Sequence, residues 1–233
     1  MIYTGKEAAR LIDISAVRTH HMRADIEATV GYAKKYHFIN VHVLPCWVKE
    51  LSEMLADSPD VRVGAPVGFP SGGAATETKL CEARQQIADG VQEMDIVMNV
   101  GKFRSGEDTY VLEELRRLVD LAKEREILTK VIIETRALSG NDEILRACDL
   151  VIRSGADFVK TGTGWIPGKL DLFQAGMIKG YLGDSIKLKV AGGIRTREEF
   201  IALVNIGVER MGINTQSAME IVEALDAQPS GDR

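Results

Sequence analysis

The chain has 233 residues, of which 45% are hydrophobic and 27% are charged, and its formal net charge is −5. This composition is typical of a folded globular protein and argues against intrinsic disorder. The acidic balance also argues against nucleic acid and membranes as partners, and no apolar run approaches the ~18 residues of a membrane span.

Short runs rich in valine and isoleucine alternate with longer amphipathic stretches, which predicts eight strands that are each followed by a helix. The first four pairs are Ala9–Ser15 with Asp25 to His37, Phe38–Leu44 with a helix carrying Trp47, Val48, Leu51 and Leu55, Val61–Val67 with Thr76–Asp89, and Glu93–Val100 with Glu107–Arg125. The last four pairs are Thr129–Glu134 with Glu143–Ser154, Phe158–Thr161 with Leu172–Leu182, Lys187–Ala191 with Arg197–Ile206, and Glu209–Gly212 with Thr215–Leu225.

The pattern of these strands predicts an α/β fold with a parallel sheet. Runs of valine and isoleucine without strict alternation are buried on both faces, as parallel sheets require. Eight strand–helix units fit a closed (β/α)8 TIM barrel, whose usual size is about 250 residues. An open doubly wound sheet is the alternative, but residues 15–18 do not form the glycine-rich turn that usually follows its first strand. We predict one barrel domain over residues 1–226 and a flexible tail over residues 227–233.

The number and spacing of the cysteines indicate the cellular compartment. Cys46, Cys81 and Cys148 are an odd number at wide spacing without a CxxC pair. This spacing favours free thiols over a disulfide framework or a zinc site. The first six residues also lack the charged-then-apolar order of a signal peptide. We therefore expect a cytoplasmic protein.

Two lysines lie near the ends of adjacent predicted strands, where barrel enzymes gather their catalytic residues. Lys160 lies in Phe158–Thr161 and Lys189 in Lys187–Ala191. Poor solvation at the barrel mouth lowers the pKa of a lysine, and a second cation lowers it further. This favours the neutral amine that a Schiff-base nucleophile must supply. The two lysines could instead hold carboxylates or a phosphate, and these residues alone leave open which one is the nucleophile.

Further charged residues lie inside predicted strands. Alternation along the strand puts Asp95 on the same face as Val97 and Asn99. A carboxylate in a barrel interior needs a partner, and the two lysines are available. Asp95 could move protons in enamine chemistry or form a structural ion pair. Lys130 and Glu134 share one face of their strand, with Glu134 at the catalytic end and Lys130 nearer the bottom.

Two glycine clusters follow the last two predicted strands. Gly192 and Gly193 come after the seventh strand, and Gly212, Asn214 and Thr215 link the eighth strand to its helix. Backbone N–H groups in such loops bind phosphate, with a helix N-terminus behind them. Barrels often place a phosphate site after strands seven and eight. The sequence therefore predicts a small phosphorylated substrate.

Other candidate sites carry less weight. His20 and His21 form a loop pair without a nearby third ligand, and the sequence has no Walker motif, zinc spacing or Ser–His–Asp arrangement. His42 alternates with Val41 and Val43 and is interpreted as a satisfied core or rim histidine. We therefore expect neither a metal nor a cofactor.

Together, several stretches resemble the class I deoxyribose-phosphate aldolases, from about residue 9 to residue 225. Their order and spacing are specific, although each stretch alone is unremarkable. The matching stretches are residues 11–13 (LID), 68–72 (GFPSG, with Thr76 and Lys79), 93–101 (EMDIVMNVG), 130–135 (KVIIET), 155–161 (GADFVKT) and 189–196 (KVAGGIRT).

The resemblance implies a TIM barrel, a homodimer or higher homo-oligomer, that reversibly cleaves 2-deoxy-D-ribose 5-phosphate to acetaldehyde and D-glyceraldehyde 3-phosphate. It implies that Lys160 is the Schiff-base lysine, that Lys189 lowers its pKa, and that Asp95 works in the proton relay. Asp13 and Lys130 also match family positions in the site, and the positions expected to bind the substrate and its phosphate further include Thr163, Gly164, Gly192, Gly193, Gly212, Asn214 and Thr215.

The chain departs from the family pattern at several positions around the site. Gly162 stands where the family usually has serine, and residues 42–45 (HVLP) replace Cys-x-Asn-Pro or Cys-x-Tyr-Pro. Asn214 and Thr215 replace the serines of the phosphate loop, and residues 14–18 (ISAVR) differ from the usual turn. Two alternatives stay open: a lysine-dependent aldolase or thiolase for another phosphorylated sugar, and a phosphosugar-binding barrel without catalysis.

Overall fold

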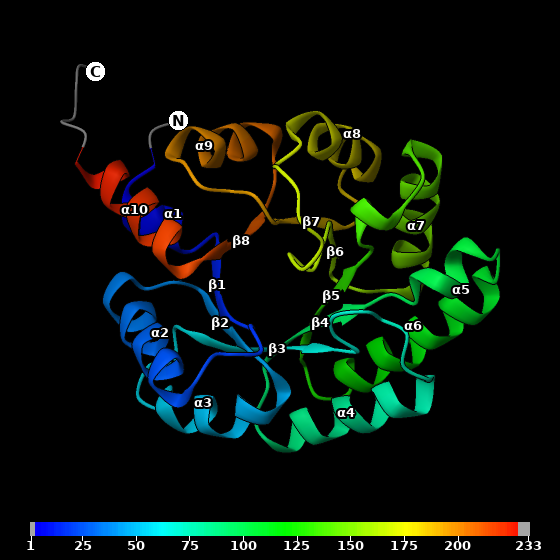
Figure 1. The fold of residues 1–233 in the computed structure, drawn as a ribbon, viewed down its shortest axis with the longest axis horizontal. Helices are drawn as coiled ribbons and strands as arrows, with labels where there is room; N and C mark the ends of the chain where they lie inside the picture. Colours follow the sequence, from blue (N-terminus) through cyan, green and yellow to red (C-terminus); the bar gives the residue numbers. More distant parts are fainter. Residues whose placement is uncertain (1–2, 228–233) are drawn as a thin grey trace.

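Eight parallel strands form a closed barrel in which each strand pairs with the next along the chain (Figure 1). β8 pairs with β1 and closes the sheet. This computed structural model, which describes residues 3–227, confirms the predicted (β/α)8 fold. The strands are β1 (Ile12–Ala16), β2 (Asn40–Val43), β3 (Arg62–Val67), β4 (Glu93–Val97), β5 (Leu128–Ile132), β6 (Phe158–Lys160), β7 (Lys187–Ala191) and β8 (Arg210–Asn214).

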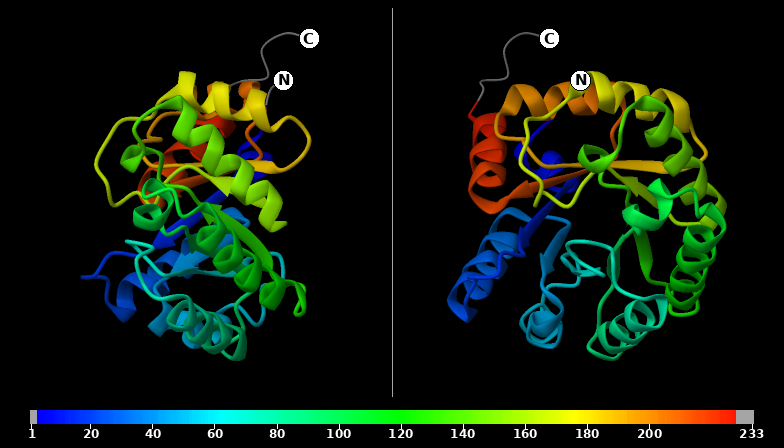
Figure 2. Two further views of the ribbon diagram at one scale, coloured as in Figure 1. Left: turned by 90° about the vertical axis from the view of Figure 1, so that its right-hand side faces the viewer. Right: turned by 45° about the vertical axis from the view of Figure 1, so that its right-hand side comes forward.

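The helices surround the barrel, as the two side views show (Figure 2). Short 3₁₀ turns over Pro45–Trp47 and Thr135–Ala137 follow β2 and β5. The helices are α1 (Gly5–Ala9), α2 (Arg23–Tyr36), α3 (Val48–Met54), α4 (Thr76–Ala88), α5 (Val100–Arg104), α6 (Asp108–Lys123), α7 (Asn141–Ser154), α8 (Leu172–Leu182), α9 (Arg197–Ile206) and α10 (Thr215–Asp226).

The periodicity of apolar residues decides which face each element buries. All five residues of β4 are buried, since one face packs into the barrel and the other against helices. On α6, Val111, Leu115, Leu118 and Ala122 are buried at helical spacing. Burying a leucine or valine side chain contributes about 1.5–3 kcal/mol. The apolar layer between barrel and helices therefore holds the strand ends, and the side chains on them, in place.

Two expected strand boundaries are wrong because local capping favours helices. Ala9 was expected in the first strand but ends α1, which begins with a capping box between Thr4 and Glu7. Val100 was expected to end the fourth strand but begins α5. Asn99 is its N-cap, and its side chain accepts a hydrogen bond from Lys102 N.

The last strand is longer than the sequence indicated. Gly212 was expected to end the eighth strand, but β8 continues to Asn214, and Gly212 lies inside it, paired with Asp13 on one side and Ala191 on the other. A Cβ atom there would lie 2.9 Å from Ala191 Cβ and 3.4 Å from Lys189 Cε. Gly212 thus leaves room for the Lys189 side chain beside it.

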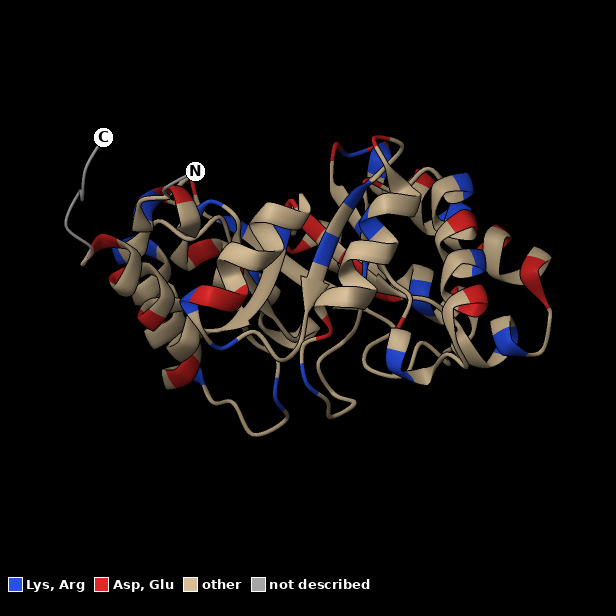
Figure 3. Ribbon diagram, turned by 90° about the horizontal axis from the view of Figure 1, so that it is seen from above, with Lys and Arg blue, Asp and Glu red and all other residues tan. Residues whose placement is uncertain are grey.

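The boundary between a domain over residues 1–226 and a tail over residues 227–233 stays a prediction. Residues 228–233 of that tail lie outside the described residues. Over residues 3–227, no helix is both long and apolar enough to cross a membrane. Acidic and basic residues are mixed over the outer helices (Figure 3).

Candidate active site

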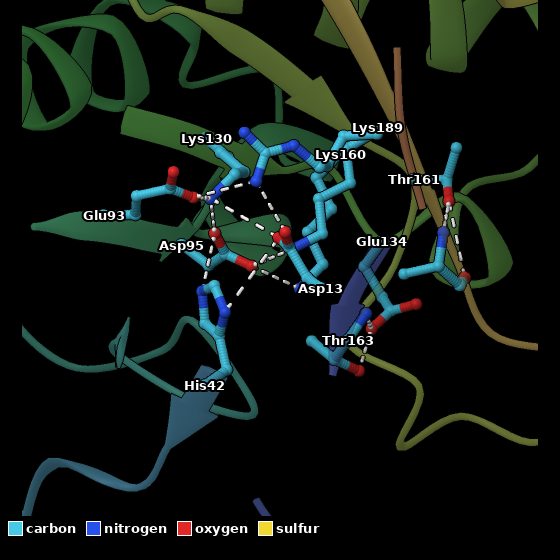
Figure 4. A network of polar contacts seen from close by, with 12 residues as sticks. Asp13, His42, Glu93, Asp95, Lys130, Glu134, Lys160, Thr161, Thr163 and Lys189 are labelled. Carbon is cyan, nitrogen blue, oxygen red and sulfur yellow. Dashed lines mark hydrogen bonds and ion pairs between the residues drawn. The ribbon is translucent and has the colours of Figure 1, made fainter. Parts of the chain in front are cut away.

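Lys160 and Lys189 meet Asp95 inside the carboxyl end of the barrel (Figure 4). Lys160 on β6 and Lys189 on β7 are register partners on neighbouring strands. Lys160 Nζ donates to Asp95 Oδ2 at 2.7 Å, and Lys189 Nζ donates to the same oxygen at 2.9 Å. One carboxylate oxygen therefore bridges two ammonium groups, all three side chains being at least nine-tenths buried.

A second layer of charges lies beneath this triad. Asp13 accepts hydrogen bonds from Lys189 Nζ at 2.5 Å and from Arg210 at 2.7 Å. Lys130 Nζ donates to Glu93 at 2.5 Å and lies 3.2 Å from Asp95 Oδ1. Charges this deeply buried persist only when they are paired, so the set forms one continuous ion-pair network.

Burial and neighbouring charges set the proton affinities in this network. Burial lowers the pKa of Lys160 to about 8, against the opposing pull of Asp95 and with a further contribution from Lys189. Burial alone would raise the pKa of Asp13, but Lys189, Lys130 and Arg210 outweigh it and hold that pKa below its usual range. Burial would lower the pKa of Lys130, yet Asp95 and Glu93 raise it. A fraction of Lys160 is therefore present as the neutral amine near neutral pH.

A cavity of about 750 Å³ opens over the triad at the carboxyl ends of the strands. Lys130 is fully buried below it and is not part of its wall. The sequence-predicted residues that line it are Asp13, Asp95, Lys160, Thr163, Gly164, Lys189, Gly192, Gly193, Gly212, Asn214 and Thr215. The structure therefore brings every residue predicted for the site except Lys130 to the wall of one cavity.

The phosphate-loop candidates lie together on the β7 and β8 side of the cavity. Gly192 and Gly193 have φ values of 95° and 92°, in the left-handed region that favours glycine. Asn214 caps α10, so the N-terminus of that helix faces the same cavity. Arg18, Arg136 and Arg195 also line it. This side of the cavity combines backbone N–H groups, a helix N-terminus and guanidinium groups, which suits an anion.

The loop between β6 and α8, which lines the cavity, is held by three side chains from outside it. The buried Glu134 carboxylate accepts from the backbone N–H of Thr163 at 3.0 Å and from its hydroxyl. Arg136 donates to the carbonyls of Ile166 and Lys169. Arg18 donates to Gly164 O at 3.0 Å and stacks on Trp165. This loop is therefore held by side chains from two other strand–helix loops, the one after β5 and the one after β1.

Glu134 also gives a physical reason for the glycine at position 162. A Cβ atom on Gly162 would lie 2.9 Å from Glu134 Oε1. Any larger residue must displace the carboxylate that fastens Thr163. The departure at this position is thus matched to the local packing.

Sequence reasoning missed Glu93, Arg210, Arg136 and Trp165 as residues of the site, and it interpreted His42 as a satisfied core or rim histidine. Glu93 shares its strand face with Asp95, so alternation could have found it. His42 lies with Nε2 3.1 Å from Asp95 Oδ1, in the barrel interior. Arg136 and Trp165 come from loops, whose positions no periodic signal predicts. Glu134, expected at the catalytic end, fastens the loop after β6 instead of lining the main cavity.

Comparison with known proteins gives consistent matches over the barrel. A family model described as DeoC/LacD family aldolase matches residues 11–214. A deoxyribose-phosphate aldolase from Klebsiella pneumoniae subsp. pneumoniae is 41% identical over 223 residues, which cover 95% of this chain and 88% of that protein.

Solved structures show the same architecture. An aldolase called QR15 superposes with a TM-score of 0.87 at 33% identity, covering 95% of this chain and 99% of that one. A tetrameric deoxyribose phosphate aldolase from Aeropyrum pernix superposes with a TM-score of 0.86 at 27% identity, covering 96% and 93% of the two chains.

Proposed function

Because this chain belongs to the DeoC/LacD family of aldolases, we propose that it cleaves 2-deoxy-D-ribose 5-phosphate reversibly to acetaldehyde and D-glyceraldehyde 3-phosphate. The observation that carries the proposal is the bridge in which Lys160 and Lys189 share Asp95 Oδ2. A site that only held phosphate would not need a buried amine with a lowered pKa, placed between a carboxylate and a second cation.

The first half of the reaction uses Lys160 as the nucleophile. Its pKa of about 8 leaves a fraction of neutral amine near pH 7, which attacks the aldehyde carbon of the open-chain sugar. Loss of water from the resulting carbinolamine gives a protonated imine. The C3 hydroxyl then loses its proton, the C2–C3 bond breaks, and its electrons move into the iminium to give an enamine. D-Glyceraldehyde 3-phosphate leaves as the first product.

The second half needs a proton at C2 and then water. The enamine takes up a proton at C2, and hydrolysis of the new imine releases acetaldehyde and restores the amine. Asp95 Oδ2 contacts both lysines, so it can pass protons between Lys160 and Lys189 during these steps. Lys189 is held in turn by Asp13, which keeps its ammonium group directed at Asp95.

The substrate phosphate is assigned to the β7 and β8 side of the cavity. Gly192, Gly193 and the N-terminus of α10 supply N–H donors, and Arg195 supplies positive charge. Among residues 3–227, the Arg195 guanidinium forms no ion pair with a carboxylate, and it donates a hydrogen bond to the carbonyl of Ile194. A guanidinium at the cavity wall without a protein counter-ion is suited to an anionic substrate group.

We also assign the protein to the cytoplasm and to a homo-oligomer. All three cysteines are free, which agrees with a reducing compartment.

On α8, Phe173 is 80% exposed, with Tyr181 and Leu172 exposed nearby. Large exposed apolar side chains on one helix suit contact with a second copy. Sedimentation of wild type and Phe173→Glu tests this, with a smaller species expected for the variant and identical species contradicting it.

Cleavage of 2-deoxy-D-ribose 5-phosphate by the purified protein tests the proposed function, with both aldehyde products measured. Wild type is expected to release equal amounts of the two, and Lys160→Ala none. A panel of other phosphorylated sugars separates this function from that of a related lysine-dependent aldolase. Turnover of another sugar phosphate with none of the deoxyribose compound would contradict the proposal.

A further inference from the structure

His42 is a buried histidine that approaches the carboxylate of Asp95 at the oxygen that Lys160 and Lys189 do not bind (Figure 4). It extends from β2 into the barrel, is 4% exposed, and reaches the floor of the cavity. Its Nε2 lies 3.1 Å from Asp95 Oδ1, whereas Lys160 and Lys189 bind Oδ2. Asp95 Oδ1 therefore faces His42 and Lys130 Nζ, which is 3.2 Å away, whereas Oδ2 faces Lys160 and Lys189.

The ring is positioned by its surroundings. A Cβ atom on Gly64, its neighbour on β3, would lie 2.5 Å from Asn40 Oδ1 and 2.6 Å from the ring atoms Cε1 and Nδ1. Only glycine at position 64 thus leaves the ring this space. Within residues 3–227, neither ring nitrogen makes an aligned hydrogen bond, but Nε2 lies 3.1 Å from Asp95 Oδ1, within reach of one. Asp95 Oδ1 is the closest charged acceptor, since Asp13 Oδ2 is 4.0 Å from Nδ1.

The charges around the ring favour its neutral form. The groups that face it are Asp13 on β1, Asp95 on β4, Lys130 on β5 and Lys189 on β7. Burial lowers the pKa of His42 to about 4, partly opposed by Asp95. At neutral pH the ring therefore carries one N–H, and an N–H on Nε2 is the donor that faces a carboxylate oxygen.

We propose that His42 is a positioning residue for this reaction: by binding Asp95 Oδ1, it limits how strongly Asp95 Oδ2 holds the ammonium form of Lys160. The part of this proposal that concerns catalysis rests on the proposed function. A donor on one oxygen draws carboxylate charge away from the other, so the ion pair with Lys160 weakens. Without that donor, Oδ2 binds the ammonium form more tightly and less neutral amine is available at a given pH.

A matched pair of substitutions separates hydrogen bonding from packing. His42→Gln keeps an N–H donor of comparable reach, whereas His42→Leu fills the space without one. The pKa of Lys160 is read from the pH dependence of its acetylation by acetic anhydride, followed by peptide mass mapping. This measurement does not require the protein to be an aldolase.

For His42→Leu, we expect the acetylation midpoint of Lys160 to rise by about one pH unit, which is a tenfold loss of neutral amine below the midpoint. His42→Gln is expected to stay near wild type. Gly64→Ala displaces the unchanged ring and is expected to shift the midpoint upward, whereas Gly31→Ala, with nothing within 4 Å of its Cβ position, is the control. Coincident midpoints for wild type and His42→Leu, or equal shifts for the Leu and Gln variants, would overturn the proposal.

Cleavage of deoxyribose phosphate, measured in parallel, distinguishes the two proposals. Turnover with coincident acetylation midpoints means that the role of His42 is wrong while the aldolase function stands. Shifted midpoints without turnover by wild type mean that His42 tunes Lys160 in a protein that is not this aldolase. In the supported case, kcat at pH 7 falls with the midpoint shift in His42→Leu and recovers in His42→Gln.

Discussion

Lys160 and Lys189 face each other across adjacent strands, and both donate to a single oxygen of Asp95. The two ammonium groups are distinguished by their remaining partners. Lys189 also donates to Asp13 at 2.5 Å, whereas Lys160 has Asp95 as its ion-pair partner and faces the cavity. Two side chains of the same type thus lie in different electrostatic surroundings.

Acetaldehyde and borohydride are expected to add one ethyl group to the protein, at Lys160. The amine with a pKa of about 8 at the cavity is the one that can form an iminium, which borohydride reduces to a stable secondary amine. Peptide mass mapping locates the label, and Lys160→Ala is expected to abolish it with its circular dichroism spectrum unchanged. Labelling of Lys189 instead would reverse the roles assigned to the two lysines.

Lys189→Leu is expected to raise the pKa of Lys160 above about 8, because a neighbouring cation that disfavours the ammonium form is removed. The trapping rate, which follows the neutral amine, would then reach half its maximum at a higher pH. The shift is expected to be smaller than the whole displacement from the ordinary lysine value, since burial is the larger cause. An unchanged pH profile would mean that burial alone tunes the amine.

Asp13→Asn is expected to lower the free energy of unfolding at pH 7 by about 3–5 kcal/mol, because it removes one partner of a buried ion-pair network. Asp13 contacts Lys189 and Arg210 at 2.5 Å and 2.7 Å. Asp57→Asn, at the exposed pair with Lys34, is the control and is expected to change stability by less than about 1 kcal/mol. Urea denaturation measures both. Equal effects would contradict the importance of the buried network.

The contribution of Asp13 to the free energy of unfolding is expected to decrease as the pH is lowered. Its folded-state pKa is held below the usual range, so the stabilisation is complete above the unfolded value of about 4 and is lost as pH falls below it. The stability difference between wild type and Asp13→Asn is therefore expected to shrink between pH 5 and pH 3. A stability difference that grew on acidification would contradict a folded-state pKa of Asp13 below its unfolded value.

The terminal phosphate is expected to be required for efficient cleavage. Charge-assisted hydrogen bonds contribute roughly 1.5–3 kcal/mol each, so free deoxyribose is expected to lose orders of magnitude in kcat/KM relative to its 5-phosphate. Arg195→Met is expected to lower kcat/KM about 10–100-fold for the phosphorylated substrate and little for the free sugar. Equal turnover of both sugars by wild type would contradict the phosphate assignment, and an equal loss for both in the variant would mean that Arg195 acts elsewhere.

Gly162→Ala is expected to lower activity through the loop after β6. The added Cβ would lie 2.9 Å from Glu134 Oε1 and push away the carboxylate that holds Thr163. We expect KM for the substrate to rise several-fold while Lys160 is still trapped by borohydride. Gly176→Ala, on α8 with nothing within 4 Å of its Cβ position, is the matched control. Identical kinetics for the two variants would show that the loop tolerates the displacement.

The sequence by itself determined the fold class, because burial on both faces of a parallel strand leaves continuous runs of valine and isoleucine that can be counted. It also singled out Lys160, Lys189 and Asp95, since charges inside such runs are costly and therefore conspicuous. Local capping at Thr4 and Asn99 moved two strand boundaries, because hydrogen bonds to a helix N-terminus outweigh the weak strand preference of a few residues.

Only the tertiary structure decided which of these groups meet and which oxygen each one binds. Asp13 and Lys189 are 176 residues apart in the chain, yet closure of β8 onto β1 and the space at Gly212 put them 2.5 Å apart. The place of His42 beside Asp95 depends in the same way on the missing side chain at Gly64 on β3, the strand between β2 and β4. Barrel closure and local clearance are properties of packing between strands, and no periodicity along a single strand records them.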